Sequence, residues 1–198
     1  MLHLTQDGCT VSRWSGGTTT QLAIFPPGAS YQDRDFLWRI SSAVVEDERS
    51  TFTELPDYDR WLLLLEGSML LTHDGGTPFR LEPGRAHAFD GGAATEGVGR
   101  CRDFNLMLRK GRCRGTLRPI RFSGAGESIL QVQTPAQGAL SRSTLLLYCA
   151  AGAGEAAMAG ERCVLAAGES ILVEDARDME MRLTVPGAAD FAAAEIVY

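Results

Sequence analysis

Short apolar or alternating stretches, each ended by a turn signal, limit what this chain can fold into. Groups of Gly, Pro and Asp separate the stretches, as at residues 74–76, 82–84 and 186–187. No long stretch repeats its apolar residues with the 3.6-residue period of a helix. The pattern therefore predicts an all-β chain, a sandwich or barrel of short strands. The predicted strands are 37–45, 61–65, 69–72, 79–81, 87–90, 104–108, 145–149, 163–165, 170–173, 179–185 and 195–197.

Two parts of the chain share one order of strands and turns. The apolar stretches 62–65 and 145–148 are each followed by a second strand and a turn glycine, Gly84 or Gly168. A chance likeness of two hairpins is the alternative to a duplication. We expect a duplicated β-barrel unit, with a first barrel over residues 1–120 and a smaller one over residues 121–198.

Residues 103–109 combine an apolar face with a polar one. As a strand they place Phe104, Leu106 and Leu108 on one face and Asp103, Asn105, Met107 and Arg109 on the other. Side chains on one face are about 7 Å apart. A carboxylate, an amide and a guanidinium in such a row suit the binding of a small polar molecule. A solvated outer face of the sheet is the alternative.

Two other segments carry candidate binding groups. Trp14 precedes a Gly-Gly pair that permits close backbone approach to a ligand, although a tight turn explains the glycines equally well. Arg39 and Ser41 share a face of a predicted strand, where a guanidinium fork and a hydroxyl could bind a carboxylate. The alternative is a surface arginine beside a serine. Residues 57–60 are predicted to form a turn whose charges pair with each other.

Composition excludes several classes of function. A net charge of −6 and a pI near 5.1 argue against nucleic acid as a partner. Five cysteines without a Cys-x-x-Cys pair indicate neither a disulfide framework nor a zinc site. No signal sequence or long apolar segment is evident, so we expect a cytoplasmic protein with no membrane partner.

The first repeat resembles a cupin barrel in its order of apolar strand, Glu-Gly, strand and Pro-Gly-x-x-His. His87 stands where metal cupins have their last histidine ligand, but Arg60 stands where they have a glutamate. One neutral ligand and a cation cannot hold a divalent metal. We therefore predict a cupin without metal or other cofactor. His87 is then a hydrogen-bonding group of the pocket or, equally, a packed or surface histidine.

Several motifs together resemble the HutD family, also called Ves. They are Trp14-Ser-Gly-Gly-Thr, Phe36-x-Trp-Arg-Ile-Ser-x-Ala, Leu55-Pro-x-x-Asp-Arg, Leu65-Glu-Gly, Phe89-Asp-Gly and Asp103-Phe-Asn-Leu-Met-x-Arg. The resemblance implies a bicupin, two fused β-barrels, without a catalytic metal. It also implies a link to bacterial histidine utilisation, or to a cold and stress response. Family members are proposed to bind a small carboxylate such as formylglutamate.

Three functional hypotheses follow. The first is a non-catalytic binder of a small carboxylate metabolite, formylglutamate-like or urocanate-like, with Arg39 or Arg109 at the carboxylate. Its expected ligand-binding residues are Trp14, Arg39, Ser41, Arg60, His87, Asp103, Asn105 and Arg109. The second is a metal-free isomerase or hydrolase in which Asp103 or His87 transfers a proton. The third is a structural or protein-interaction role, for which a homodimer is plausible.

Overall fold

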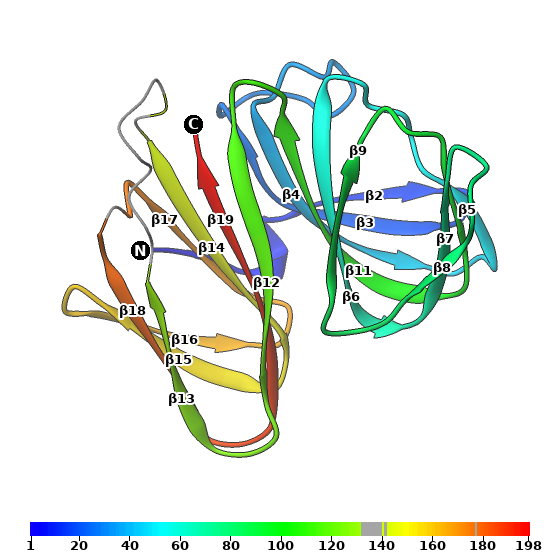
Figure 1. The fold of residues 1–198 in the computed structure, drawn as a ribbon. Coiled ribbons are helices and arrows are strands. Elements are labelled where there is room, and N and C mark those ends of the chain that lie inside the picture. The colour runs from blue at the N-terminus through cyan, green and yellow to red at the C-terminus, as the bar shows by residue number, and fades with distance from the viewer. Residues whose placement is uncertain (132–139, 141, 177) are drawn as a thin grey trace. The chain divides into compact units, whose positions relative to one another are not determined.

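The computed structural model describes residues 1–131, 140, 142–176 and 178–198 (Figure 1). Within these residues the regular elements are nineteen strands and one short 3-10 helix, η1 (Gln6–Gly8). The prediction of an all-β chain is therefore confirmed. No helix in the described ranges is long and apolar enough to cross a membrane.

The chain forms two compact units. Cys9–Arg114 make up the first unit, and Met1–Gly8 with Gly115–Tyr198 make up the second. The structure thus divides the chain before residue 120, at the start of a strand. It also assigns the first residues to the second unit, because the strand that they form pairs with a strand of that unit.

The first unit consists of two antiparallel sheets. The six-stranded sheet has the order β2 (Thr10–Trp14), β3 (Gly17–Phe25), β4 (Trp38–Val45), β11 (Cys101–Arg109), β6 (Tyr58–Gly67) and β9 (Ala86–Asp90). The four-stranded sheet has the order β5 (Arg49–Thr51), β10 (Thr95–Val98), β7 (Met69–His73) and β8 (Phe79–Leu81). The turn predicted at residues 57–60 is wrong, since β6 already begins at Tyr58 and buries Arg60.

The core of the first unit lies between its two sheets. Leu62 and Leu64 of the longer sheet pack with Met69, Leu71 and Leu81 of the shorter one. These residues alternate along their strands, so that one face of each sheet is apolar and turned inward. The apolar filling occupies only part of the interior, because other inward positions of the same strands carry polar side chains.

The second unit is built in the same way. Its five-stranded sheet has the order β1 (Leu2–Leu4), β17 (Ser170–Glu174), β14 (Ser143–Ala151), β19 (Ala189–Val197) and β12 (Arg114–Phe122). Its four-stranded sheet has the order β13 (Gly126–Gln131), β18 (Glu180–Val185), β15 (Ala153–Met158) and β16 (Glu161–Ala166). Leu145 and Leu147 of the first sheet pack with Met181 and Leu183 of the second in an apolar core.

The two units repeat one strand order. The sequence β4-β11-β6-β9 in the first unit recurs as β12-β19-β14-β17 in the second, and β5-β10-β7-β8 recurs as β13-β18-β15-β16. Each of these eight strands of the first unit therefore corresponds to the strand eight places later in the chain. The internal duplication expected from the sequence is present in the topology.

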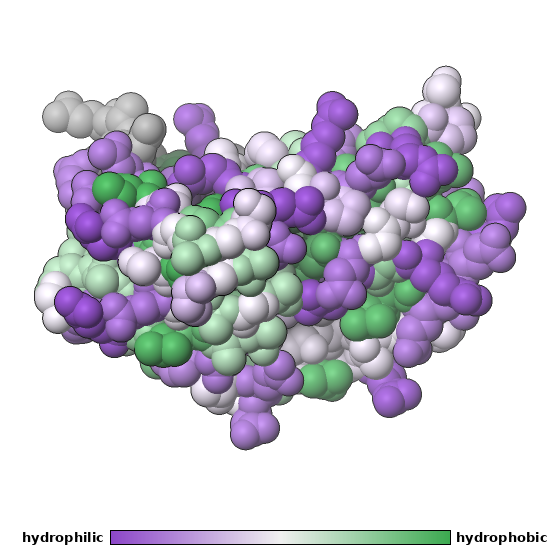
Figure 2. Space-filling model, turned by 90° about the horizontal axis from the view of Figure 1, so that it is seen from below, coloured by the Kyte–Doolittle hydropathy of each residue, from purple (hydrophilic) through white to green (hydrophobic). Residues whose placement is uncertain are grey.

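On the face shown in Figure 2, strongly hydrophobic residues are dispersed among hydrophilic ones.

Candidate functional site

A cavity of about 270 Å³ opens inside the first unit, between its two sheets. Its volume is close to the lower limit of ligand pockets, about 300 Å³, and suits a small metabolite. Its lining residues come from β2, β3, β4, β5, β6 and β11 and from two connecting segments. They are Ser12, Trp14, Thr19, Tyr31, Arg39, Ser41, Ala43, Val45, Ser50, Thr51, Phe52, Thr53, Arg60, Asp103, Asn105 and Met107.

Strand register brings the polar lining residues together. In the β4–β11 pair, Ser41 lies opposite Asn105 and Arg39 opposite Met107. In the β6–β11 pair, Arg60 lies on the other side of Met107. Directly opposed side chains of neighbouring strands are about 5 Å apart, so three adjacent strands direct their polar groups into one space.

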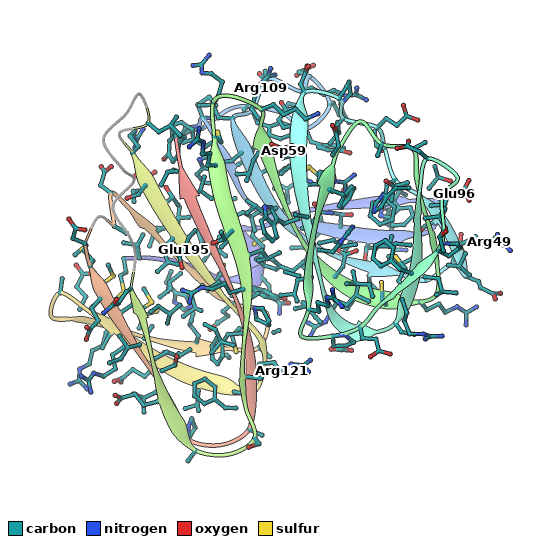
Figure 3. The ribbon with its side chains drawn as sticks, viewed as in Figure 1. Arg49, Asp59, Glu96, Arg109, Arg121 and Glu195 are labelled. Carbon is teal, nitrogen blue, oxygen red and sulfur yellow. The ribbon has the colours of Figure 1, made fainter. Side chains whose placement is uncertain are left out.

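Six of the eight predicted ligand-binding residues line this cavity, and two do not. Trp14, Arg39, Ser41, Arg60, Asp103 and Asn105 are lining residues, whereas His87 and Arg109 are absent from the lining. Arg109 has the same strand parity as Asp103 and Asn105, but it is the last residue of β11 and binds a loop instead. Its side chain is labelled in Figure 3.

Arg39 is buried and already has two hydrogen-bond partners. Its Nε donates to Oε1 of Gln21 at 2.8 Å, and Nη1 donates to Oγ of Ser41 at 3.2 Å. Its guanidinium carbon lies 4.5 Å from the centre of the Tyr31 ring, a cation–π contact. Burial lowers the pKa of Arg39, and Tyr31 partly opposes that shift. Nη2 has no hydrogen bond to the described residues, so this end of the group is available to a ligand.

Arg60 offers a larger free edge. Only 4 % of the residue is exposed, and Nη1 donates to the carbonyl oxygen of Thr53 at 3.3 Å. Nε is buried and has no hydrogen-bond partner in the described part of the chain. Burial lowers the pKa of Arg60 to about 10, so the group still carries its charge at neutral pH. Nε and Nη2 form the edge with which arginine binds a carboxylate in bidentate fashion.

The rings of Phe52 and Phe89 surround the Arg60 guanidinium. The guanidinium carbon lies 5.1 Å from the centre of the Phe52 ring and 5.3 Å from that of Phe89. These cation–π contacts compensate part of the cost of burying the charge. They also hold the plane of the group in place.

Asp103 and Asn105 supply unused acceptors. Asp103 is 4 % exposed and Asn105 is 7 % exposed. Oδ1 of each lacks a hydrogen-bond partner among the residues that the structure describes. Burial raises the pKa of Asp103 to about 7, although the positive charge of Arg60 opposes this. Buried polar atoms without partners are uncommon, and a ligand with N–H or O–H donors would satisfy both.

The indole of Trp14 lies at the more exposed part of the lining. It is 38 % exposed, and its Nε1 donates to Oγ1 of Thr19 at 3.2 Å. Trp14 pairs with Gly17 across a two-residue turn, so the glycines belong to the hairpin of β2 and β3. The tight-turn alternative is thus what the backbone shows, while the ring itself still lines the cavity.

Sequence reasoning missed Gln21, Tyr31, Phe52 and Thr53. Gln21 was separated from Arg39 by a loop of unknown path, and the bulge after it in β3 changes the register with β4. The other three belong to connecting segments, whose positions alternation does not reveal. The closeness in sequence of Tyr31 to Arg39 and of Phe52 to Arg60 was the usable signal, since aromatic rings often lie against arginine side chains.

His87 forms a pair with His73 instead of lining the cavity. The two Nε2 atoms are 2.9 Å apart, and Nδ1 of His73 lies 2.8 Å from Oγ1 of Thr95. Thr95 donates its own hydrogen to the carbonyl of Ala93 and so accepts from His73. His87 must then donate to His73. Burial lowers the pKa of both histidines.

No group of three or more metal-ligating His, Cys, Asp or Glu side chains occurs in the described ranges.

Comparison with known proteins gives consistent matches. The family model described as HutD matches residues 7–193. Protein Ves of Cronobacter sakazakii is 32% identical over 122 residues, which are 54% of this chain and 60% of Ves. The match therefore spans about three fifths of the length of this curated relative.

Solved structures share the fold along nearly the whole chain. A conserved protein of unknown function, PA5104 of Pseudomonas aeruginosa PAO1, is 28% identical, with a TM-score of 0.82 over 98% of this chain and 97% of that one. HutD of Pseudomonas fluorescens SBW25, in its formate condition, is 22% identical, with a TM-score of 0.70 over 98% and 97%. A cupin 2 barrel-domain protein of Leptotrichia buccalis is 11% identical, with a TM-score of 0.55 over 95% and 91%. The last two likenesses show a cupin-type fold and no more.

Proposed function

The chain belongs to the HutD family, and from this premise we propose that its first unit binds a small carboxylate metabolite without transforming it. The observation that carries the proposal is the set of unsatisfied polar groups around one cavity. Arg60 has a free, charged edge, and Asp103 and Asn105 have free acceptors. A ligand that is an anion at one end and a hydrogen-bond donor at the other would satisfy all three.

Charge supports an anionic ligand. The lining contains two arginines and one carboxyl group whose pKa is about 7, so its net charge at neutral pH is positive. Arg60 and Asp103 form no ion pair within 4.0 Å in the described part of the chain. A ligand placed between them could contact both.

The proposed contacts follow from the free atoms. Nε and Nη2 of Arg60 bind the carboxylate side-on, and Nη2 of Arg39 adds a further donor. Oδ1 of Asp103 and of Asn105 accept from an amide or imidazole N–H of the ligand. Formylglutamate and urocanate both combine a carboxylate with an N–H, which fits a role in regulating histidine utilisation.

Isothermal titration with formylglutamate, urocanate, formiminoglutamate, glutamate and formate tests this proposal. Formate is included because the P. fluorescens HutD structure has a formate condition. We expect Arg60→Gln to weaken binding of the best ligand at least about tenfold, since a charged hydrogen bond contributes roughly 1.5–3 kcal/mol. Arg85→Gln, an exposed arginine outside the lining, is the matched control. Absence of heat with all five compounds would contradict the proposal.

A metal-free enzyme is the second candidate, because Asp103 is buried and its pKa lies near neutrality. Proton transfer needs a partner group, and the lining supplies only Tyr31 and the two arginines as other titratable side chains. Incubation of each compound with the protein, followed by NMR, distinguishes the candidates. Conversion that disappears in Asp103→Asn while binding persists would favour the enzyme.

A further inference from the structure

The segment of residues 26–37 connects β3 to β4 and carries Tyr31 to the cavity. The Tyr31 ring lies against one face of the Arg39 guanidinium at 4.5 Å and stacks on Phe36 with ring centres 6.3 Å apart. Tyr31 also packs against the buried cluster of Phe36, Tyr58 and Met107. The segment therefore decides which part of Arg39 a ligand can reach.

Arg109 and Tyr58 hold this segment by its carbonyl groups. Nη2 of Arg109 donates to the carbonyl of Arg34 at 2.6 Å, and Nε donates to that of Phe36 at 3.3 Å. The Tyr58 hydroxyl lies 2.8 Å and 2.9 Å from the same two carbonyl oxygens. Arg109 and Tyr58 also contact each other, with Nη2 3.1 Å from the hydroxyl oxygen.

The end of β11 adds backbone support to the same place. The backbone N–H of Arg109 donates to the carbonyl of Leu37 at 2.8 Å. Arg34 has a φ of +55°, a left-handed backbone that is unfavourable for a residue other than glycine. The charged hydrogen bond from Arg109 to the Arg34 carbonyl offsets part of this cost.

We propose that Arg109 is a positioning residue that, with Tyr58, fixes the 26–37 segment so that Tyr31 covers one face of Arg39. Arg109 then acts on the ligand through Tyr31 and does not touch it. The consequence for binding rests on the proposed function. With one face covered and Nε bound to Gln21, Arg39 meets the ligand only through its Nη2 end, whereas Arg60 provides the bidentate edge.

We call the hold that Arg109 and Tyr58 have on the 26–37 segment the latch. Hydrogen–deuterium exchange of the full chain tests the latch without any ligand. The amides of Ala29, Ser30 and Arg34 are hydrogen-bonded inside the segment. We expect their exchange to become about tenfold faster in Arg109→Gln and in Tyr58→Phe, because local opening requires loss of these anchors. Arg102→Gln is the matched control, because Arg102 lies on the same strand as Arg109 and its ion pair with Glu66 is away from the 26–37 segment.

Titration with formylglutamate tests the consequence. Arg109→Gln should bind it about tenfold more weakly, because the segment is no longer preorganised. The same change in a Tyr31→Ala background should have little further effect, and Arg109→Lys should restore part of the affinity. A purely structural defect would weaken binding equally in both backgrounds.

The outcomes separate the two ideas. If wild-type protein binds no probe, the proposed function fails, and the exchange rates alone uphold or overturn the latch. Unchanged exchange in both Arg109→Gln and Tyr58→Phe overturns the latch. Faster exchange with unchanged affinity, in a wild type that does bind, overturns the positioning role.

Discussion

Burial opposes the ionisation of Asp103 and the protonation of His73 and His87. Burial raises the pKa of Asp103 to about 7 and lowers the pKa of His73 and His87. The neutral form of each group is thus favoured in the folded protein. Their effects on stability have opposite dependence on pH.

Asp103→Asn should stabilise the protein more at pH 8 than at pH 5. The pKa of Asp103 is higher in the folded chain than in the unfolded chain, so its favourable contribution at low pH is lost as the pH rises through about 7. Each unit of pKa difference corresponds to about 1.4 kcal/mol. Urea unfolding of wild type and variant at both pH values measures the effect. Asp59→Asn, an exposed carboxylate on β6, is the control. An equal effect at both pH values would contradict the prediction.

His87→Gln should reduce the loss of stability in mild acid. Burial and the positive charges of His73 and Arg85 lower the pKa of His87 in the folded protein. The stabilisation that the neutral histidine pair contributes is fully present above the unfolded-state pKa, about 6.5. It is lost as the pH falls through the lower pKa of the folded protein. Thermal unfolding between pH 7.5 and 5 should show a smaller decrease for the variant than for wild type. An unchanged slope in His87→Gln would refute the role of the pair.

At this scale, alternation predicted residues that line the cavity only where they share a strand with one another. Asp103, Asn105, Arg39 and Ser41 were identifiable because a period of two fixes which side chains share a face. Alternation also placed Arg109 on the face of Asp103 and Asn105, but it does not reveal where along a strand the cavity ends. The partner of His87 could not be read from the sequence either, because it depends on the register of two sheets.

Gly67 and Gly111 both have a positive φ, but a side chain would meet a steric clash only at Gly67. Comparing them distinguishes the energetic cost of the backbone conformation from the cost of a clash. Gly67, at the end of β6, has a φ of +78°, and a Cβ there would lie 2.3 Å from the carbonyl oxygen of Arg100. Gly111, after β11, has a φ of +71° and nothing within 4 Å of such a Cβ. Each position requires a left-handed backbone that favours glycine.

Gly67→Ala should destabilise the protein more than Gly111→Ala. We expect about 1–2 kcal/mol for Gly111→Ala from conformation alone. Gly67→Ala should exceed it, since the β6–β11 pair must also move apart. Chemical denaturation of both variants measures the difference, and equal losses would show that the contact is relieved without cost.

The strands that prediction missed include some rich in alanine, besides polar ones such as β2 (Thr10–Trp14) and β13 (Gly126–Gln131). β15 (Ala153–Met158) and most of β19 (Ala189–Val197) escaped prediction because alanine has a low intrinsic preference for strands. In the structure, Ala156 and Ala193 are fully buried in the core of the second unit, where small side chains fit between two sheets. Packing outweighs propensity in these strands.

For the whole molecule, the first strand of the chain belongs to the second unit. β1 is the edge strand of its sheet and pairs with β17 through Leu2, His3 and Leu4. Truncation of residues 1–8 should therefore accelerate amide exchange in β17 and leave β6 and β9 unchanged. Exchange followed by peptide mass spectrometry measures both, with Ser12→Ala as a full-length control. Faster exchange in the first unit alone would contradict the assignment.

The fold class and the duplication were predictable at this scale, whereas the division of the chain was not. Repeated turns and apolar stretches indicate an all-β chain with a repeated unit. Which unit residues 1–8 belong to depends on a pairing between positions separated by most of the chain. Long-range pairing of this kind leaves no local signal.

The repeated strand order has a consequence for how the two halves tolerate mutation. Strands β6 and β11 direct Arg60, Asp103 and Asn105 into a cavity, while their counterparts β14 and β19 direct leucine, alanine and phenylalanine into an apolar core. Equivalent strands of one topology thus surround different interiors, since the first holds charged groups around a cavity and the second holds apolar side chains. Mutational tolerance should accordingly differ between equivalent positions of the two halves: function restricts the first, and volume restricts the second.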